Sequence, residues 1–223
     1  NNNIIVRVLD VNFTTLPFGT PSNPTYGTIL STAPAGYYNS IEGLSGAALK
    51  QELQNIIANP SVVRAHSYAD VVEILKTADQ NPENNNQVWL IYNEIPRTKL
   101  DYQTTSSIIG KWNREHIYCQ SRGNFGDFYN TPADGIGIWL STNANDIAAG
   151  LSDAHHIRAV DGQENSSRNN RNYGIDYNGP PGAPSSWKGD VARAIFYMAV
   201  RYNGLNVVNG NPADSTLGQI GDL

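Results

Sequence analysis

Three segments of the chain carry apolar residues at the three- and four-residue spacing of an amphipathic helix. The first, residues 44–59, is ended by Pro60, and the second, residues 67–79, begins with Ser67, a favourable helix cap. The third, residues 188–203, is capped near Asp190. The residues expected to face the core are Leu49, Leu53, Ile56 and Ile57 in the first helix, Val71, Val72 and Leu75 in the second, and Ala194, Ile195, Met198 and Ala199 in the third.

Shorter apolar segments predict strands. Residues 4–9 predict an N-terminal strand, which a long wrapping loop follows, and residues 87–95 are dense in the β-branched and aromatic residues of a buried strand. REHIYC (114–119) and AHHIRAV (154–160) predict two more. Asp161 comes next, with Glu164 three residues later, a capping pattern that predicts a helix through about Asn172. Without repeats or a linker, residues 1–223 are expected to form one α+β domain.

Composition narrows the classes of function. With 39% hydrophobic and 16% charged residues the chain is typical of a globular protein, and no apolar run approaches the ~18 residues of a membrane span. Its start lacks the pattern of a signal peptide, as a processed chain would. The single Cys119 excludes an internal disulfide framework and a Cys-rich zinc site. The net charge of −5 argues mildly against a nucleic-acid partner, although residues 97–201 are nearly balanced in charge.

The segment WNREHIY (112–118) carries the first candidate chemistry. Histidine is the natural general base near neutral pH, and His116 directly follows Glu115 and Arg114. The same three residues could equally form the solvated, charged end of a strand. The segment therefore gains weight only together with a second one.

That second segment is DAHHIRAVDGQENSSRNNRNYG (153–174). On a helix starting near Gly162, one face would carry Asn165, Arg168, Asn169 and Asn172. Amide oxygens and a guanidinium suit a hydrated Mg²⁺ and a phosphate. A zinc site built from His116, His155, His156 and Glu115 is an alternative, but no HExxH motif or cysteine pair supports it. Neither a G-x-S-x-G elbow nor a glycine-rich phosphate loop is present.

Taken together, four segments resemble the bacterial endonuclease I family of secreted non-specific nucleases. They occur in the family's order and cover most of the chain from about Tyr37 to Asn203. They read YYNSIEGLSGAALKQELQNII, WNREHIY, DAHHIRAVDGQENSSRNNRNYG and KGDVARAIFYMAVRY. The resemblance implies a ββα-metal finger over about residues 111–174, in which two strands and a helix surround one divalent cation.

The resemblance also implies roles for individual residues. His116 would be the general base, and Glu115 and Asn165 would hold Mg²⁺, with Mn²⁺ or Ca²⁺ as substitutes. Arg168 would contact the phosphate. Supporting roles fall to Arg114, Asp153, His155 and Asn169, while Cys119 is expected to be a structural thiol. The implied activity is Mg²⁺-dependent, sequence-non-specific endonuclease cleavage of DNA, with RNA as a further substrate, leaving 5′-phosphate ends.

The resemblance implies a secreted or periplasmic protein whose partner is nucleic acid, with neither a membrane nor an obligate protein partner. Two features of the sequence do not fit the implied site directly. Glu115 and His116 are neighbours, which face opposite ways on a regular strand, so a strand end, bulge or loop is predicted there. The family's proline-containing run after the histidine is replaced by IYCQS. The alternative is an inactive nucleic-acid or glycan binding module, favoured if His116, Glu115 and Asn165 do not converge.

Overall fold

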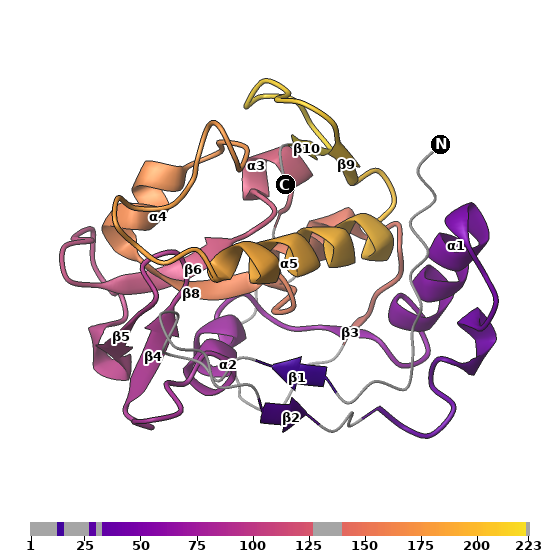
Figure 1. The fold of residues 1–223 in the computed structure, drawn as a ribbon, viewed down its shortest axis with the longest axis horizontal. Helices are drawn as coiled ribbons and strands as arrows, with labels where there is room; N and C mark the ends of the chain where they lie inside the picture. Colours follow the sequence, from indigo (N-terminus) through magenta and orange to yellow (C-terminus); the bar gives the residue numbers. More distant parts are fainter. Residues whose placement is uncertain (1–12, 16–26, 30–32, 127–139, 222–223) are drawn as a thin grey trace.

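The computed structural model describes residues 13–15, 27–29, 33–126 and 140–221 (Figure 1). The strands are β1 (Phe13–Thr15), β2 (Gly27–Ile29), β3 (Arg64–Ala65), β4 (Gln87–Leu90), β5 (Ile95–Thr98), β6 (Trp112–His116), β7 (Leu140–Ser141), β8 (Ile157–Asp161), β9 (Asn206–Val208) and β10 (Gln219–Gly221). The α-helices are α1 (Gly46–Ile57), α2 (Asp70–Ala78), α3 (Gln120–Gly123), α4 (Gly162–Arg168) and α5 (Trp187–Arg201). The 3₁₀ helices are η1 (Asn39–Ile41), η2 (Lys99–Asp101) and η3 (Ile147–Ser152).

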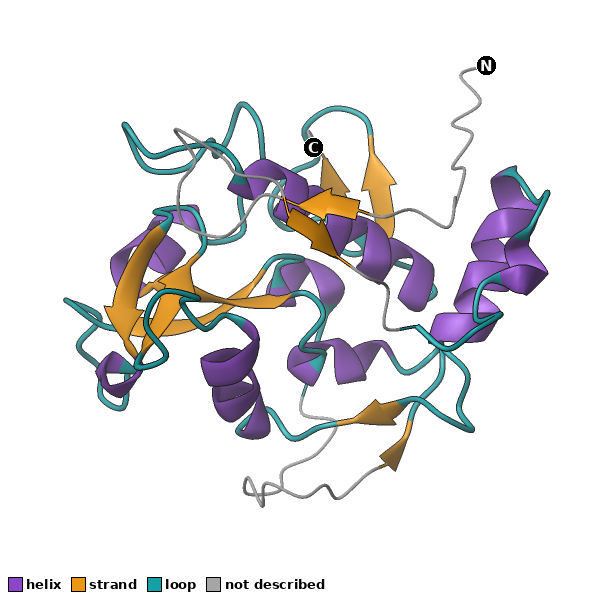
Figure 2. Cartoon of the chain, turned by 60° about the horizontal axis from the view of Figure 1, so that its bottom comes forward, coloured by secondary structure: helices purple, strands orange, loops and turns teal. Residues whose placement is uncertain are grey.

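The centre of the molecule is the antiparallel pair β6–β8, in register from Trp112 opposite Asp161 to His116 opposite Ile157. The β4–β5 hairpin lies beside it, since Ile91 forms a parallel bridge with Val160 of β8. Helix α2 packs against β4, β6 and β8, and α4 follows β8 directly and packs against β6 and β8 (Figures 1 and 2). Mixed helices and small sheets agree with the predicted α+β class.

Alternation along β8 divides the core into two clusters. Ile157 and Ala159 pack with α2 and with Val88, Leu90 and Trp112, whereas Val160 packs with α5. The second cluster is the larger, and it includes Ile195 and Met198 of α5 together with the aromatic residues Tyr92, Tyr173, Tyr177 and Trp187. Strand residues that face opposite ways thus join two separate sets of helices to one sheet.

The predicted strand over residues 87–95 is wrong in its second half. The strand β4 ends at Leu90, and a tight turn carries the chain into β5, so that Leu90 pairs with Ile95. Tyr92 and Glu94 adopt positive φ angles of 70° and 51° in this turn. An apolar run gives no sign of such a turn when its left-handed positions hold residues other than glycine.

The three amphipathic helices are confirmed, with shifted ends. Ser67 accepts a hydrogen bond from the Asp70 backbone in the turn before α2, but the residue directly before the helix is Ala69, so the predicted cap lies two residues too early. Helix α5 begins before the predicted cap Asp190, which lies within its first turn. Of the predicted core residues, Leu49, Val71, Leu75, Ala194, Ile195, Met198 and Ala199 are buried, while Leu53, Ile56, Ile57 and Val72 are half-buried.

The helix predicted from Asp161 through Asn172 is only half right. The Asp161 side chain accepts hydrogen bonds from the backbone of Gln163 and Glu164, which confirms the cap. Helix α4 then ends at Arg168, because Asn169 turns to a positive φ of 49°. Asn169 and Asn172 therefore do not continue the predicted polar stripe, and Asn172 is fully buried.

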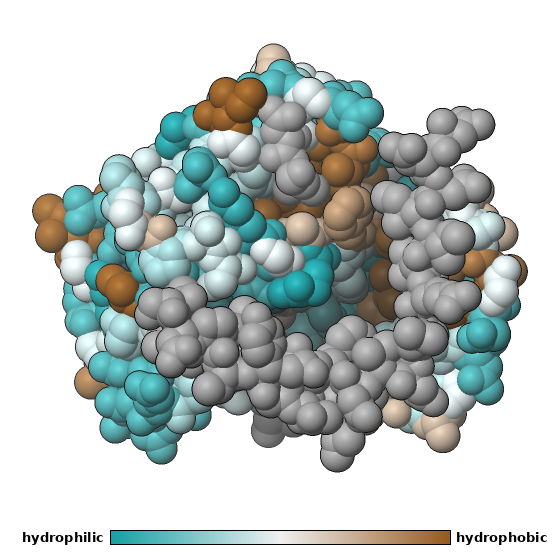
Figure 3. Space-filling view, viewed as in Figure 1, coloured by the Kyte–Doolittle hydropathy of each residue, from teal (hydrophilic) through white to brown (hydrophobic). Residues whose placement is uncertain are grey.

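Two other predictions concern segments that differ or lie outside the described residues. The strands predicted from REHIYC and AHHIRAV are β6 and β8, but β6 stops at His116 and β8 begins after the histidine pair. The strand predicted at residues 4–9 lies outside the described residues. On the face shown in Figure 3, hydrophobic patches lie among mostly hydrophilic residues. None of the described helices has the length and apolar character to cross a bilayer.

Asp79, in the connection between α2 and β4, makes the stability of the fold depend on pH. Its carboxylate accepts the Ala159 backbone N–H at 2.7 Å, and burial raises its pKa from 3.8 to about 6 despite nearby Arg158. A raised acid pKa means that the folded state binds the proton more tightly, so stability falls as pH rises from about 4 to about 6. This loss is on the order of 2–3 kcal/mol. We expect Asp79→Asn, which keeps an acceptor oxygen, to remove it.

Urea unfolding of both proteins at pH 4.5 and pH 7.5 measures this effect. The variant should gain stability relative to the parent at the higher pH. Asp101→Asn, at a carboxylate exposed to solvent and paired with Lys111, serves as the control. Parallel pH curves for the parent and Asp79→Asn would contradict the prediction.

Candidate active site

Strand β6 presents its side chains alternately to two sides. Arg114 and His116 lie on the side of Tyr68, which contacts both residues. Glu115 and Asn113 lie on the α4 side, where they contact Arg168 and Asn165. The strand ends at His116, as the adjacency of the Glu115–His116 pair predicts, but the two side chains still diverge.

His116 ends the strand in a buried, oriented position. Its Nε2 lies 2.9 Å from the Leu151 carbonyl oxygen, and its ring stacks on Tyr68 with centroids 5.4 Å apart. Because a carbonyl only accepts, Nε2 carries the proton and Nδ1 keeps a lone pair. Burial, with a further contribution from His156, lowers the pKa of His116 to about 3. The imidazole is therefore neutral at pH 7, with one defined tautomer.

Glu115 is buried on the opposite side of β6. Its Oε1 accepts a hydrogen bond from the Tyr92 hydroxyl at 2.7 Å and lies 3.3 Å from Nη1 of Arg168. Burial raises the pKa of Glu115, and Arg168 partly opposes that shift. Among the described residues no hydrogen bond reaches Oε2. One carboxylate oxygen is thus fixed by its neighbours while the other has no donor there.

Asn165 of α4 adds a second oxygen on this side. Its Nδ2 donates to the Asn113 side chain at 2.8 Å and to the Arg114 carbonyl at 3.2 Å. This orientation leaves Oδ1 without a donor within the described part of the chain. A carboxylate oxygen and an amide oxygen are ligands that Mg²⁺ and Ca²⁺ prefer. The donor chemistry of Glu115 and Asn165 therefore fits a hard divalent cation whose remaining ligands are waters.

Arg168 lies behind the site. It is 1% exposed, and its guanidinium donates to the carbonyls of His116 at 3.1 Å and Ile117 at 2.8 Å while pairing with Glu115. The guanidinium carbon of Arg168 lies 4.7 Å from the centre of the Tyr173 ring. In this arrangement Arg168 fixes the end of β6 and the Glu115 carboxylate from within, and its guanidinium faces protein groups.

Two of the predicted supporting residues, Asp153 and His155, lie in the loop that leads into β8. The Asp153 carboxylate accepts hydrogen bonds from the hydroxyls of Tyr197 and Tyr202, both at 3.0 Å, and from His155. It thereby ties this loop to α5. His155 itself is exposed and stacks on Tyr197, whereas His156 is buried with its Nε2 2.7 Å from the Gly150 carbonyl. Asn169 lies outside α4, with its carbonyl near the buried thiol of Cys119.

The zinc alternative lacks its ligand set. Across the described ranges, no three His, Cys, Asp or Glu side chains converge as a metal site would require. His155 pairs with Asp153, and Nε2 of His156 lies within hydrogen-bond distance of the Gly150 carbonyl of η3. A structural or catalytic zinc site needs at least three such ligands.

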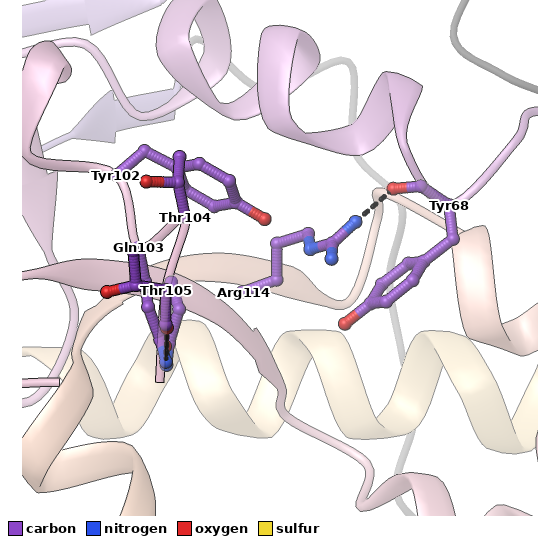
Figure 4. A pocket seen from close by; sticks show the side chains of 7 residues that line it. Tyr68, Tyr102, Gln103, Thr104, Thr105 and Arg114 are labelled. Atoms are coloured by element: carbon purple, nitrogen blue, oxygen red, sulfur yellow. Dashed lines mark hydrogen bonds between the residues drawn. The ribbon is translucent and has the colours of Figure 1, made fainter. Parts of the chain in front are cut away.

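The motifs in the sequence did not single out four polar residues that belong to the site. Asn113 holds Asn165, Tyr92 holds Glu115, and Tyr68 and Tyr102 lie on either side of Arg114 (Figure 4). Asn113 belongs to the same short segment as the His–Glu pair, so its position could have suggested it. The tyrosines come from distant segments, and only the fold brings them together.

Residues 45–185 match the family model described as Endonuclease I. The chain belongs to the endonuclease I family. The segment with Glu115 and His116 and the segment with Asn165 and Arg168 both fall inside the matched range. The geometry above is therefore that of an endonuclease I domain, and the resemblance seen in the sequence is confirmed.

Two relatives extend the match beyond these residues. The chain is 36% identical over 207 residues to the extracellular ribonuclease of Bacillus amyloliquefaciens, covering 84% of this chain and 63% of the relative. It is also 36% identical over 198 residues to the extracellular ribonuclease of Bacillus subtilis (strain 168), covering 80% and 60%. This endonuclease I chain thus spans about three fifths of the length of these curated relatives. No solved structure matches it.

Proposed function

We propose that this endonuclease I chain is a nuclease that hydrolyses phosphodiester bonds in RNA and DNA with the help of a divalent cation, and that it acts outside the cell. The observation that carries the proposal is a neutral His116 of fixed tautomer at the end of β6, next in sequence to Glu115, whose carboxylate faces the side of the strand on which Asn165 contacts the Arg114 carbonyl. The names of the two relatives support RNA as a substrate and an extracellular location.

In this function His116 is the general base. Its Nδ1 accepts the proton of the attacking water, while Nε2 keeps its bond to the Leu151 carbonyl. That bond also stabilises the imidazolium which forms, because the carbonyl dipole points at the positive ring. Proton transfer of this kind contributes about 10²–10⁴-fold to the rate. Arg168 positions the strand end, and Arg114 contacts Tyr68 on the same side of β6 as His116.

Glu115 and Asn165 would hold the cation through the two oxygens that have no donor among the described residues. When bound, Mg²⁺, or Mn²⁺ or Ca²⁺ in its place, stabilises negative charge on the phosphate and on the leaving 3′ oxygen. The Tyr92 hydroxyl and Arg168 keep the Glu115 carboxylate in one orientation. The expected products carry 5′-phosphate ends. Contact with phosphates rather than base edges makes cleavage sequence-non-specific.

One observation favours a second function, the binding of nucleic acid without cleavage. Glu115 and Asn165 lie on one side of β6 and His116 on the other, and Glu115 and His116 are 2% and 7% exposed. A scaffold of this kind could hold a strand through Arg114 and still fail to hydrolyse it. The two functions differ in one measurable outcome, the appearance of new chain ends.

Removal of the metal tests the proposed function. We expect supercoiled plasmid DNA and a single-stranded RNA to be degraded with Mg²⁺, to survive in EDTA, and to be degraded again when Mg²⁺ is added in excess. The fragments should accept a 5′ label from a kinase only after phosphatase treatment. Binding by gel shift with intact nucleic acid in Mg²⁺, Mn²⁺ and Ca²⁺ alike would instead establish the second function.

A further inference from the structure

A cavity of about 360 Å³ opens beside β6, next to Tyr68 and Arg114 (Figure 4). It is lined by Tyr68, Tyr102, Gln103, Thr104, Thr105, Asn113 and Arg114. The volume lies near the lower end of the ~300–1,000 Å³ range of small-molecule sites. The cavity therefore suits one small group of a ligand and is too small for a segment of duplex.

Arg114 forms a flat, fixed wall of this cavity. Its guanidinium carbon lies 3.4 Å from the centre of the Tyr68 ring and 5.9 Å from that of Tyr102, and its Nη1 donates to the Tyr68 carbonyl. Figure 4 shows the guanidinium between the two tyrosines. Planar guanidinium and aromatic groups are the surfaces on which proteins stack unpaired nucleobases.

The remaining lining is polar and carries no negative charge. The side-chain amide of Asn113 donates a hydrogen bond to that of Gln103 at 2.7 Å, and Gln103 in turn donates to the Thr105 carbonyl at 2.9 Å. Thr104 and Thr105 are exposed at the rim. With one cation and no carboxylate among its seven lining residues, the cavity can accept a group attached to a phosphate chain.

The cavity lies next to the proposed base. Arg114 and His116 are two residues apart on one side of β6, a separation of roughly 7 Å along an extended strand. Tyr68 contacts both side chains. A ligand in the cavity is therefore within the reach of a single nucleotide from His116.

We propose that this cavity is a nucleobase subsite, which takes the unstacked base of a single-stranded nucleic acid. The placement of the adjacent phosphate at His116 rests on the proposed function, whereas the binding of the base does not. A paired base cannot enter unless the duplex opens, so the subsite favours single strands and RNA loops over duplex DNA. Stacking is open to every base, so the subsite adds affinity with little sequence preference.

Direct binding tests the subsite without requiring catalysis. In EDTA, the unaltered chain is titrated with a fluorescent uridine hexamer and with a hexamer of the same sugar–phosphate backbone that lacks bases. We expect the base-bearing hexamer to bind about ten-fold more tightly. Thr104→Leu, which fills the cavity, and Arg114→Lys, which keeps the charge but removes the plane, should each abolish this ratio. Ser106→Leu, on the same exposed segment outside the lining, should leave it unchanged.

Each outcome bears on one proposal. Equal affinity for the two hexamers, absence of binding, or a ratio unchanged in both cavity variants overturns the subsite, even if the chain degrades RNA with Mg²⁺. A base-dependent ratio in a chain that never cleaves nucleic acid supports the subsite and refutes the proposed hydrolysis. Circular dichroism melts of all three variants show whether each retains the fold of the parent.

Discussion

Replacing His116 with alanine is expected to lower the rate of phosphodiester cleavage by about two to four orders of magnitude. The physical reason is the loss of Nδ1, the nitrogen left unprotonated by the bond between Nε2 and the Leu151 carbonyl. Initial rates on a labelled single-stranded RNA with saturating Mg²⁺ measure the effect. Binding of Mn²⁺, followed by calorimetry, should change little, since the ring belongs to the other side of β6.

His155→Ala is the matched control. This second histidine is exposed and pairs with Asp153, so its loss should change the rate only slightly. Comparable cleavage by the parent and His116→Ala would remove His116 from the mechanism. Loss of cleavage in both variants would point to the loop before β8 rather than to proton transfer.

Arg168→Ala is expected to destabilise the fold by about 3–5 kcal/mol, the cost of leaving one member of a buried ion pair without its partner. Arg168 and Glu115 are 1% and 2% exposed. The substitution also leaves the carbonyls of His116 and Ile117 without their donors. Urea unfolding at pH 7.5 gives the free energy. The double variant Arg168→Met with Glu115→Gln should be more stable than Arg168→Ala, because it leaves no buried charge.

The exposed ion pair Arg193–Asp190 offers a comparison of the same chemistry in solvent. Arg193→Ala should cost less than about 1 kcal/mol. If Arg168→Ala proves equally mild, the buried pair does not organise the site as described, and Arg168 becomes available again for a direct contact with phosphate.

Much of the fold follows from local patterns. The cap at Asp161 and the buried face of α5 could be predicted, because each depends on residues a few positions apart. The β4–β5 turn and the early end of α4 could not. Both depend on residues other than glycine at positive φ, Tyr92 and Asn169 among them. Such a conformation forms only where tertiary packing offsets its conformational strain.

The site was predictable as a set of residues but not as a geometry. The pairing of β6 with β8 brings WNREH alongside α4, which the order of motifs suggests. Sequence cannot show that Arg168 is buried, because an arginine in a polar segment looks like a surface cation. Nor can it show the wall of Arg114 and Tyr68, since residue 68 precedes a helix that packs on the strand only in the folded chain.

The carbonyls of η3 make the site resistant to one kind of genetic change. Leu151 orients His116 through its main chain while its own side chain is buried in the core, so a replacement must keep both the backbone path and an apolar side chain. Gly150 has no such freedom, because a Cβ there would approach the Phe125 ring to 2.6 Å. Substitution at residue 151 therefore cannot remove the carbonyl that sets the proton on His116, but core packing limits it to apolar residues, and lack of space limits residue 150 to glycine.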